Sequence, residues 1–191
     1  MIGILPQNAK TKTKNLDLAE KLNFNLKKFK ALRYGENPHQ QSAYYVEDEK
    51  NPGYKQLWGI ELSHNNLADA NHAWSLVCEF EEPTVAIIKH GNPSGITSRK
   101  NLAEAFSLSY EADSVSAFGG IIAVNKAPTL EMIEKMHGIF FELLIAPDFS
   151  EEVLERLKKR SQKMRVVKAK KPTRRLELTR VFDGYLVQTP D

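Results

Sequence analysis

The feature that most constrains this chain is a short, unbroken apolar run that stops at two ionisable residues. Residues 85–88 (VAII) are rich in β-branched side chains and too few for a helix, which predicts a central strand buried on both faces. Lys89 and His90 follow directly, and the next segment, GNPSG at 91–95, predicts a loop. Since open α/β sheets bind ligands at the carboxyl ends of strands, the sequence predicts a candidate site at Lys89 and His90.

Two interpretations of this pair are open. A Lys-His pair at the end of a strand is commonly a solvated cap without a chemical role. Against that reading, a stiff strand and an Asn-Pro turn would hold both side chains in place, and histidine is the side chain that titrates closest to neutrality. The pair is therefore a site hypothesis that needs further observations.

Composition is typical of a soluble globular protein with one core. Of 191 residues, 41% are apolar and 27% are charged. No apolar run approaches the roughly 18 residues that cross a bilayer, and the first residues lack the long apolar segment of a signal peptide, so we expect a cytoplasmic protein without a membrane partner. Cys78 is the single cysteine. An internal disulfide and a cysteine-rich zinc site within one chain are therefore excluded, and no metal is expected.

The positive charge is concentrated in one segment. Residues 151–175 hold eleven Lys or Arg and three acidic residues, although the whole chain carries only +3. Such a cluster could bind nucleic acid, but it contains no aromatic side chain for base stacking. Basic residues at the end of a helix also interact favourably with the helix dipole. Nucleic-acid binding through residues 156–175 is therefore kept only as an alternative.

The order of elements predicts the fold class. Residues 1–26 are polar and weakly periodic, which indicates a leader or linker, and residues 27–191 are expected to form one subdomain. Within it, apolar stripes and caps predict helices that alternate with strands, giving a three-layer α/β/α structure with a mostly parallel sheet. Closely spaced late strands suggest an antiparallel addition at one edge. The predicted helices follow caps at Asn65 or Asn66, Thr129 and Ser150 and also cover 100–110; the predicted strands are 42–47, 85–88, 121–124, 141–147, 164–168, 176–180 and 184–187.

Residues 29–41 form a dense polar loop around Gly and Pro. The segment contains Arg33 and Tyr34 followed by Glu36. Loops with this many functional groups often bind ligands. An Arg-Glu pair that braces a turn is the competing interpretation, and the sequence leaves both open.

Two further positions are unusual for their surroundings. Gly119 and Gly120 precede the predicted strand 121–124, where the lack of a Cβ atom would let a ligand or a second backbone approach closely, although a plain turn is also possible. Glu142 lies among apolar residues of the predicted strand 141–147. A carboxylate there is costly unless it faces a cation or a hydrogen-bond donor.

Several of these segments together resemble a known family. LRYGENPHQ at 32–40, KHGNPSG at 89–95 and DSVSAFGGIIAVN at 113–125 are similar to the signature segments of the AICAR (phosphoribosylaminoimidazolecarboxamide) formyltransferase domain of bifunctional purine biosynthesis proteins. ELSHNNLADA at 61–70 and FELLIAP at 141–147 extend the resemblance in the same order. It implies a cytidine-deaminase-like α/β fold, without zinc chemistry because the chain lacks H-x-E with P-C-x-x-C.

The resemblance also implies a reaction. Family members transfer a formyl group from the co-substrate 10-formyltetrahydrofolate to the 5-amino group of AICAR in IMP biosynthesis. Lys89 and His90 match the catalytic pair of the family. His90 would take the proton of the attacking amine, and Lys89 would stabilise the developing oxyanion and help protonate the folate leaving nitrogen.

Five more residues match substrate-binding positions of the family. Arg33 and Tyr34 would hold the nucleotide, because the guanidinium group suits a phosphate. Gly119 would let the AICAR ring approach closely, and Glu142 would meet the polar edge of that ring. Asn92 would hold the catalytic loop.

The resemblance implies that the chain covers only part of a family member. The transferase domain of the family consists of two related subdomains, and this chain resembles the first; it does not resemble the cyclohydrolase domain, which usually precedes the transferase. Active sites of the family form across a dimer interface, so the expected partner is a second copy or a complementary second-half chain. A catalytically silent binding or assembly subunit is the alternative.

Overall fold

The computed structural model describes residues 2–4, 18–173 and 176–189. The chain divides into two compact units, one formed by Met1–Asn25 together with Pro172–Asp191 and the other by Leu26–Lys171. Most of the leader or linker expected at 1–26 lies outside the described residues. Each unit is described separately below.

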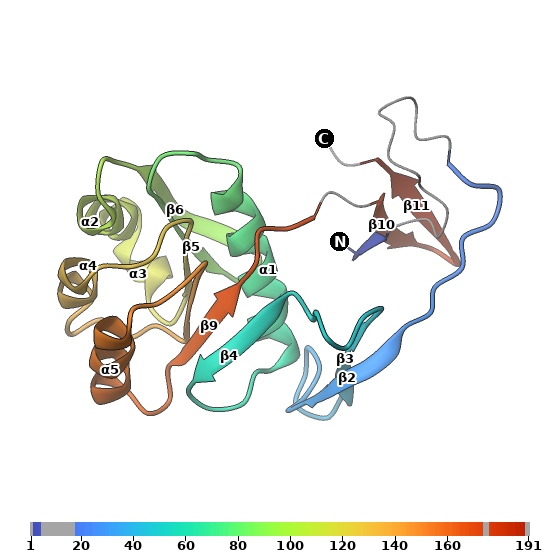
Figure 1. The fold of residues 1–191 in the computed structure, drawn as a ribbon, viewed down its shortest axis with the longest axis horizontal. Coiled ribbons are helices and arrows are strands. Elements are labelled where there is room, and N and C mark those ends of the chain that lie inside the picture. Colours follow the sequence, from blue (N-terminus) through green and yellow to red (C-terminus); the bar gives the residue numbers. More distant parts are fainter. Residues whose placement is uncertain (1, 5–17, 174–175, 190–191) are drawn as a thin grey trace. The chain divides into compact units, whose positions relative to one another are not determined.

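The larger unit is built on a six-stranded sheet with the order β4-β9-β8-β7-β5-β6 (Figure 1). The ladders β7-β8 and β8-β9 are parallel, and the ladders β4-β9, β5-β7 and β5-β6 are antiparallel. The strands are β4 (Tyr54–Trp58), β5 (Thr84–Lys89), β6 (Asn92–Ser98), β7 (Ile121–Val124), β8 (Leu143–Ala146) and β9 (Arg165–Ala169).

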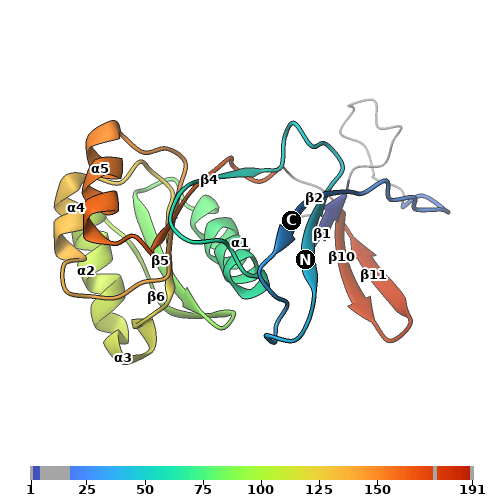
Figure 2. The ribbon, with the colours of Figure 1, turned by 90° about the horizontal axis from the view of Figure 1, so that it is seen from below.

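Helices cover both faces of this sheet, which makes three layers. Figure 2 shows α1 on one side of the strands and α2, α4 and α5 on the other. The side chains of β5 alternate accordingly: Val85 and Ile87 pack in the core beneath α2, α4 and α5, whereas Ala86 and Ile88 pack against α1. The helices are α1 (His64–Cys78), α2 (Leu102–Ala112), α3 (Ser114–Ala117), α4 (Leu130–Lys135) and α5 (Glu151–Arg160).

The α/β class and the three layers confirm the sequence prediction, but the expectation of a mostly parallel sheet holds only for β7, β8 and β9. One cause is the segment 91–95, which was expected to be a loop. Instead, the chain reverses within His90 and Gly91, and β6 begins at Asn92 and pairs with β5. A two-residue reversal can only join antiparallel strands.

Polar side chains cap the helices at the predicted places, with one exception. Thr129 caps α4 and Ser150 caps α5, as their sequences indicate. The cap of α1 is Ser63 and not Asn65 or Asn66. Ser63 and Asn66 form a reciprocal capping box, in which each side chain accepts a hydrogen bond from the other residue's backbone N–H.

The remaining strands form two small antiparallel sheets. In the larger unit, β2 (Lys27–Leu32) pairs with β3 (Ser42–Val46). In the smaller unit, β10 (Leu176–Val181) pairs with both β1 (Ile2–Ile4) and β11 (Gly184–Gln188). Of the late strands expected as an antiparallel addition at one edge of the main sheet, β10 and β11 therefore form a separate sheet, whereas β9 lies within the main sheet. Among the described residues, no helix is long and apolar enough to cross a membrane.

Candidate active site

Lys89 is the last residue of β5, and its side chain reaches the segment that precedes β7. Lys89 Nζ donates a hydrogen bond of 2.7 Å to the carbonyl oxygen of Phe118. Because the ammonium group has three N–H donors, the contact with Phe118 leaves further donor capacity. Lys89 is only partly exposed. Its charge is thus fixed beside the two glycines rather than free in solvent.

His90 and Gly91 form the tight turn between β5 and β6. Both residues have positive φ angles, 52° and 77°, as a type I′ hairpin turn requires. Asn92 Nδ2 donates to the carbonyl oxygen of His90 at 3.2 Å. The backbone N–H groups of His90 and Gly91 donate to the two carboxylate oxygens of Asp69 in α1, at 3.1 and 2.8 Å. The exposed His90 ring therefore projects from a turn whose backbone is held on two sides.

The paired glycines lie level with the end of β5. Ile88 is the register partner of Ile121, so Gly120 stands beside the end of β5. A Cβ atom on Gly120 would come within 3.0 Å of the carbonyl oxygens of Ile88 and Ala117. The N–H of Gly119 donates to the carbonyl oxygen of Phe140 at 2.9 Å, and Gly119 has a φ of 75°. Close backbone packing explains Gly120, and a left-handed conformation explains Gly119.

Glu142 precedes β8 and faces two polar partners. Its Oε2 atom accepts a hydrogen bond from Asn66 Nδ2 at 2.7 Å and lies 3.5 Å from Arg165 Nη1. Arg165 Nε donates to the carbonyl oxygen of Glu61 at 3.1 Å. Glu142 thus has the cation and the donor that the sequence analysis required, while its side chain remains 42% exposed.

The side chain of Arg165, which carries a guanidinium group, is only 4% exposed. Burial lowers the pKa of this group, the Glu142 carboxylate offsets part of that shift, and the Arg33 guanidinium adds to it. Tyr34 also acts on the pKa of Arg165, by raising it. Arg33 and Tyr34 are therefore electrostatic neighbours of the Glu142–Arg165 pair.

Arg33 and Tyr34 are held near the start of α1. The backbone N–H of Arg33 donates to the carbonyl oxygen of Leu62 at 3.4 Å, and that of His64 to the carbonyl oxygen of Tyr34 at 3.2 Å. The Arg33 guanidinium stacks 4.7 Å above the centre of the Tyr34 ring and donates to its hydroxyl at 2.9 Å. Arg33 pairs with Tyr34 here, and none of the ion pairs among the described residues joins it to Glu36.

These positions share one edge of the sheet. Ile121 is the register partner of Ile88 and of Leu143, so Lys89, Gly120 and Glu142 lie level across β5, β7 and β8. Arg165 pairs with Leu143 and so lies one residue further along, at the start of β9, where it completes the row. At about 4.8 Å between strands, the row spans about 14 Å. The sequence predicted a site at the carboxyl ends of strands, and of the strands in this row only β5 ends there. Because β5 is antiparallel to β7, its carboxyl end meets the amino ends of β7, β8 and β9.

The sequence analysis missed several residues of this edge. Asp69, Asn66 and Arg165 bind the turn or Glu142; Asn66 and Asp69 lie in the segment 61–70 that resembles the family, but none of the three was assigned a role at the site. Their signal is contextual: a polar residue on the helix that covers the strand ends, or a cation at the start of a strand. At the start of α1, Nδ1 of His64 lies 3.1 Å from Ser42 Oγ. Among the described residues no group of His, Cys, Asp or Glu could hold a metal ion.

An apolar surface adjoins the row and was also not predicted. Phe118 and Phe140 are 56% and 45% exposed, and their rings lie 5.6 Å apart between centres. Val115 in α3, one turn before Phe118, is 84% exposed. Phe118 is also the residue whose carbonyl oxygen binds Lys89. An apolar contact area therefore begins directly beside the ammonium group.

Comparisons with known proteins give a consistent result. The model of the family described as the AICARFT/IMPCHase bienzyme matches residues 4–191. Three relatives named bifunctional purine biosynthesis protein PurH are 44% identical over 179 residues (Clostridium kluyveri), 41% over 181 (Thermoanaerobacter sp.) and 45% over 175 (Staphylococcus carnosus). These alignments cover 92%, 93% and 89% of this chain but 36%, 35% and 35% of the relatives. The chain thus spans about a third of the length of these relatives.

Proposed function

Because the chain belongs to the AICARFT/IMPCHase bienzyme family, we propose that it supplies one part of a formyltransferase active site for purine biosynthesis. The reaction transfers the formyl group of 10-formyltetrahydrofolate to the 5-amino group of AICAR. The observation that carries the proposal is the row of Lys89, Gly120, Glu142 and Arg165 at one sheet edge, with the His90 turn at its end.

The catalytic roles follow from the chemistry of acyl transfer. The AICAR amine is a weak nucleophile because it is conjugated to the imidazole carboxamide, so it needs a base as it attacks the formyl carbon. His90 is exposed and can take that proton directly or through the carboxamide. The Lys89 ammonium, fixed on the Phe118 carbonyl, has donors left for the oxyanion and for the folate nitrogen that leaves.

The substrate-binding roles follow from the partners that each group keeps. The exposed Arg33 side chain has N–H donors beyond the one that binds Tyr34, and these suit the phosphate of AICAR. Asn66 and Arg165 engage Oε2 of Glu142, so its Oε1 atom is available to accept N–H groups from the base. Gly119 has no side chain to keep the ring away from the backbone, and a Cβ atom built there would already contact the Phe140 ring at 3.7 Å.

The exposed aromatic surface suits the folate. The rings of Phe118 and Phe140 can pack against the pterin, with Lys89 next to the transferred group. A complete site needs more contacts than this open edge offers, because a ligand pocket normally encloses most of its ligand. We therefore propose that a second copy of the chain or a complementary chain covers the edge. A cytoplasmic location stays a prediction.

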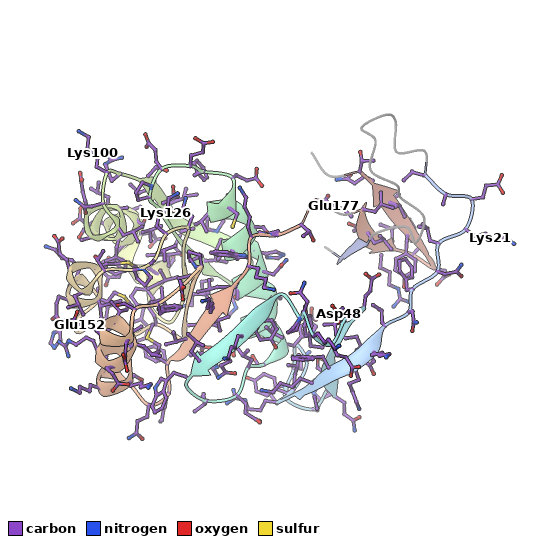
Figure 3. The ribbon with its side chains drawn as sticks, in the orientation of Figure 1. Lys21, Asp48, Lys100, Lys126, Glu152 and Glu177 are labelled. Carbon is purple, nitrogen blue, oxygen red and sulfur yellow. The ribbon has the colours of Figure 1, made fainter. Side chains whose placement is uncertain are left out.

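Reconstitution tests the proposal. The chain is mixed with a polypeptide that corresponds to the remaining part of a relative's transferase domain, and formyl transfer to AICAR is followed. We expect activity that Lys89→Ala and His90→Ala each reduce by about 100-fold or more. Lys126→Ala is the matched control, because Lys126 follows the far end of β7 (Figure 3).

Binding separates the enzyme from the alternatives. AICAR should raise the melting temperature of the chain or of the mixture, Arg33→Ala should weaken that effect, and inorganic phosphate should compete. Binding without formyl transfer in the reconstituted mixture would favour a silent assembly subunit. The absence of both AICAR binding and formyl transfer would refute the proposal.

A further inference from the structure

We propose that Asp69 is a positioning residue that fixes the His90 side chain for proton transfer. The inference rests on the proposed function, because it concerns the base of that reaction. Asp69 is partly buried in α1 and lies 21 residues before His90 in the sequence. Its carboxylate is the contact between α1 and the turn that carries the base.

Both oxygens of this carboxylate bind the turn. Oδ2 accepts the N–H of His90 at 3.1 Å, and Oδ1 accepts the N–H of Gly91 at 2.8 Å. Two successive N–H groups that point the same way form a small anion-binding concavity, and a carboxylate fills it with charge-assisted hydrogen bonds. The geometry requires both amides to face α1, which defines the orientation of the peptide plane on each side of His90.

The turn needs this restraint because its conformation is unfavourable for histidine. His90 has a φ of 52°, in the left-handed region that costs free energy for a residue with a Cβ atom. Little packs against the turn at Gly91, where the nearest group to a Cβ atom built on this residue is His72 Nδ1, at 3.9 Å. The other contact on the turn is the Asn92 side chain, at 3.2 Å from the His90 carbonyl oxygen.

The same helix positions the groups that would bind AICAR. Asn66 holds the Glu142 carboxylate at 2.7 Å, and the N–H of His64 holds the Tyr34 carbonyl at 3.2 Å. Residues 64, 66 and 69 therefore tie the Tyr34 loop, Glu142 and His90 to successive positions of one rigid element. Releasing the turn from Asp69 would leave the substrate groups in place and move the base alone.

The test uses Asp69→Ala, Asp69→Asn and the control Asp48→Ala. Asp48 Oδ1 accepts the N–H of Lys50 at 2.9 Å in the loop between β3 and β4, so the control removes a similar contact elsewhere (Figure 3). Exchange of the His90 and Gly91 amide protons is measured by NMR. Asp69→Ala should accelerate it by about 10- to 100-fold, the factor that corresponds to losing a hydrogen bond to a charged group. Asp69→Asn keeps one acceptor oxygen, so its exchange rates should lie between those of the wild type and of Asp69→Ala. The exchange rates of Asp48→Ala should match those of the wild type.

Kinetics of the reconstituted enzyme complete the test. Asp69→Ala should lower kcat by about 10- to 100-fold, as misplacement of a reacting group does, with KM for AICAR nearly unchanged. Asp69→Asn, which preserves the size of the side chain, carries the test if the alanine variant does not fold. Unchanged exchange, or faster exchange with wild-type kcat, would overturn the inference. An inactive wild-type mixture would instead refute the proposed function, while exchange would still report whether Asp69 restrains the turn.

Discussion

At the scale of single residues, Arg165 is a buried charged side chain whose stability depends on its neighbours. An arginine side chain that is 4% exposed depends on its hydrogen bonds and on a counter-charge, and Glu142 supplies that charge from a half-exposed position. The backbone adds support, because the N–H of Arg165 donates to the carbonyl oxygen of Glu142 at 3.0 Å. The carboxylate proposed to bind substrate thus also supports the fold.

Variants of Arg165 and of Glu142 should lower the free energy of unfolding by different amounts. Arg165→Met removes the buried donors and should lower the free energy of unfolding by about 2–3 kcal/mol, the range for hydrogen bonds to charged groups. Glu142→Gln keeps an acceptor for Asn66 and loses a solvent-screened charge, so about 1 kcal/mol is expected. Urea unfolding measures both values. The double variant should cost less than the sum, and strict additivity would show that the two side chains are not coupled.

Tyr54 is a residue whose hydroxyl group weakens the fold. This hydroxyl is buried without a hydrogen-bond partner among the described residues. Removing it by Tyr54→Phe should leave stability unchanged or raise it by about 1 kcal/mol, because the variant buries no unsatisfied polar atom. Thermal unfolding measures the difference. A clear loss of stability in Tyr54→Phe would mean that the hydroxyl is paired in solution.

The same residue predicts a pH effect. Burial, with a further contribution from Tyr44, raises the pKa of Tyr54 to about 12, from 10. The folded state therefore keeps a proton that the unfolded state loses, so stability should fall as the pH rises from 10 to 12. Tyr54→Phe should lack this part of the decline when unfolding is compared at pH 9 and 11.5. Parallel pH curves for the two proteins would contradict the assignment.

At the scale of elements, Gly95 in strand β6 and Gly138 after helix α4 are required for different reasons. A Cβ atom on Gly95 would lie 2.0 Å from the carbonyl oxygen of Ser109 in α2, so Gly95→Ala must move backbone and should cost about 3 kcal/mol or more. Gly138 has a φ of 78° and open space around it, so Gly138→Ala should cost only about 1–2 kcal/mol. Denaturant unfolding of both variants tests the order, and equal costs would contradict the close packing of β6 against α2.

Sequence patterns predicted those elements whose own residues determine them. The apolar run at 85–88 predicted β5 and placed Lys89 and His90 at its end, and local caps predicted the starts of α4 and α5. The strand β6 was missed because Gly, Asn and Pro favour loops, whereas its pairing depends on a neighbour supplied by the turn. Asp69 and Arg165 were missed for a related reason, since their roles arise from contacts with residues distant in the sequence.

At the scale of the whole molecule, the basic segment is largely engaged within the chain. Most of its described cations bind a partner, which leaves fewer of them for phosphate groups and weakens the case for nucleic-acid binding. The partners are Glu134 for Arg156, Glu155 for Lys158, carbonyl oxygens of Met136 and Ile139 for Arg160, Glu142 for Arg165, Asp148 for Lys168 and Asn51 for Lys170. Residues 174 and 175 lie outside the described chain.

The division into two units predicts which part folds alone. Both large apolar clusters lie within Leu26–Lys171, whereas the described residues of the smaller unit form a cluster of two buried residues, Leu176 and Leu178, with Leu22 and Val187 against them. A three-stranded sheet with so little apolar burial in its described part depends on other contacts for its stability. We therefore expect residues 26–171 to fold in isolation and to unfold cooperatively, within about 5 °C of the full chain.

Near-ultraviolet circular dichroism and AICAR binding of the 26–171 fragment would check this prediction together. Every residue of the proposed site lies inside this unit, from Arg33 to Arg165, so the fragment should keep both its tertiary signal and any affinity that the full chain has for AICAR. A fragment that keeps its helical signal but loses the tertiary signal would show that its core needs the strands of the smaller unit. A folded fragment that loses affinity would show that the smaller unit takes part in the site.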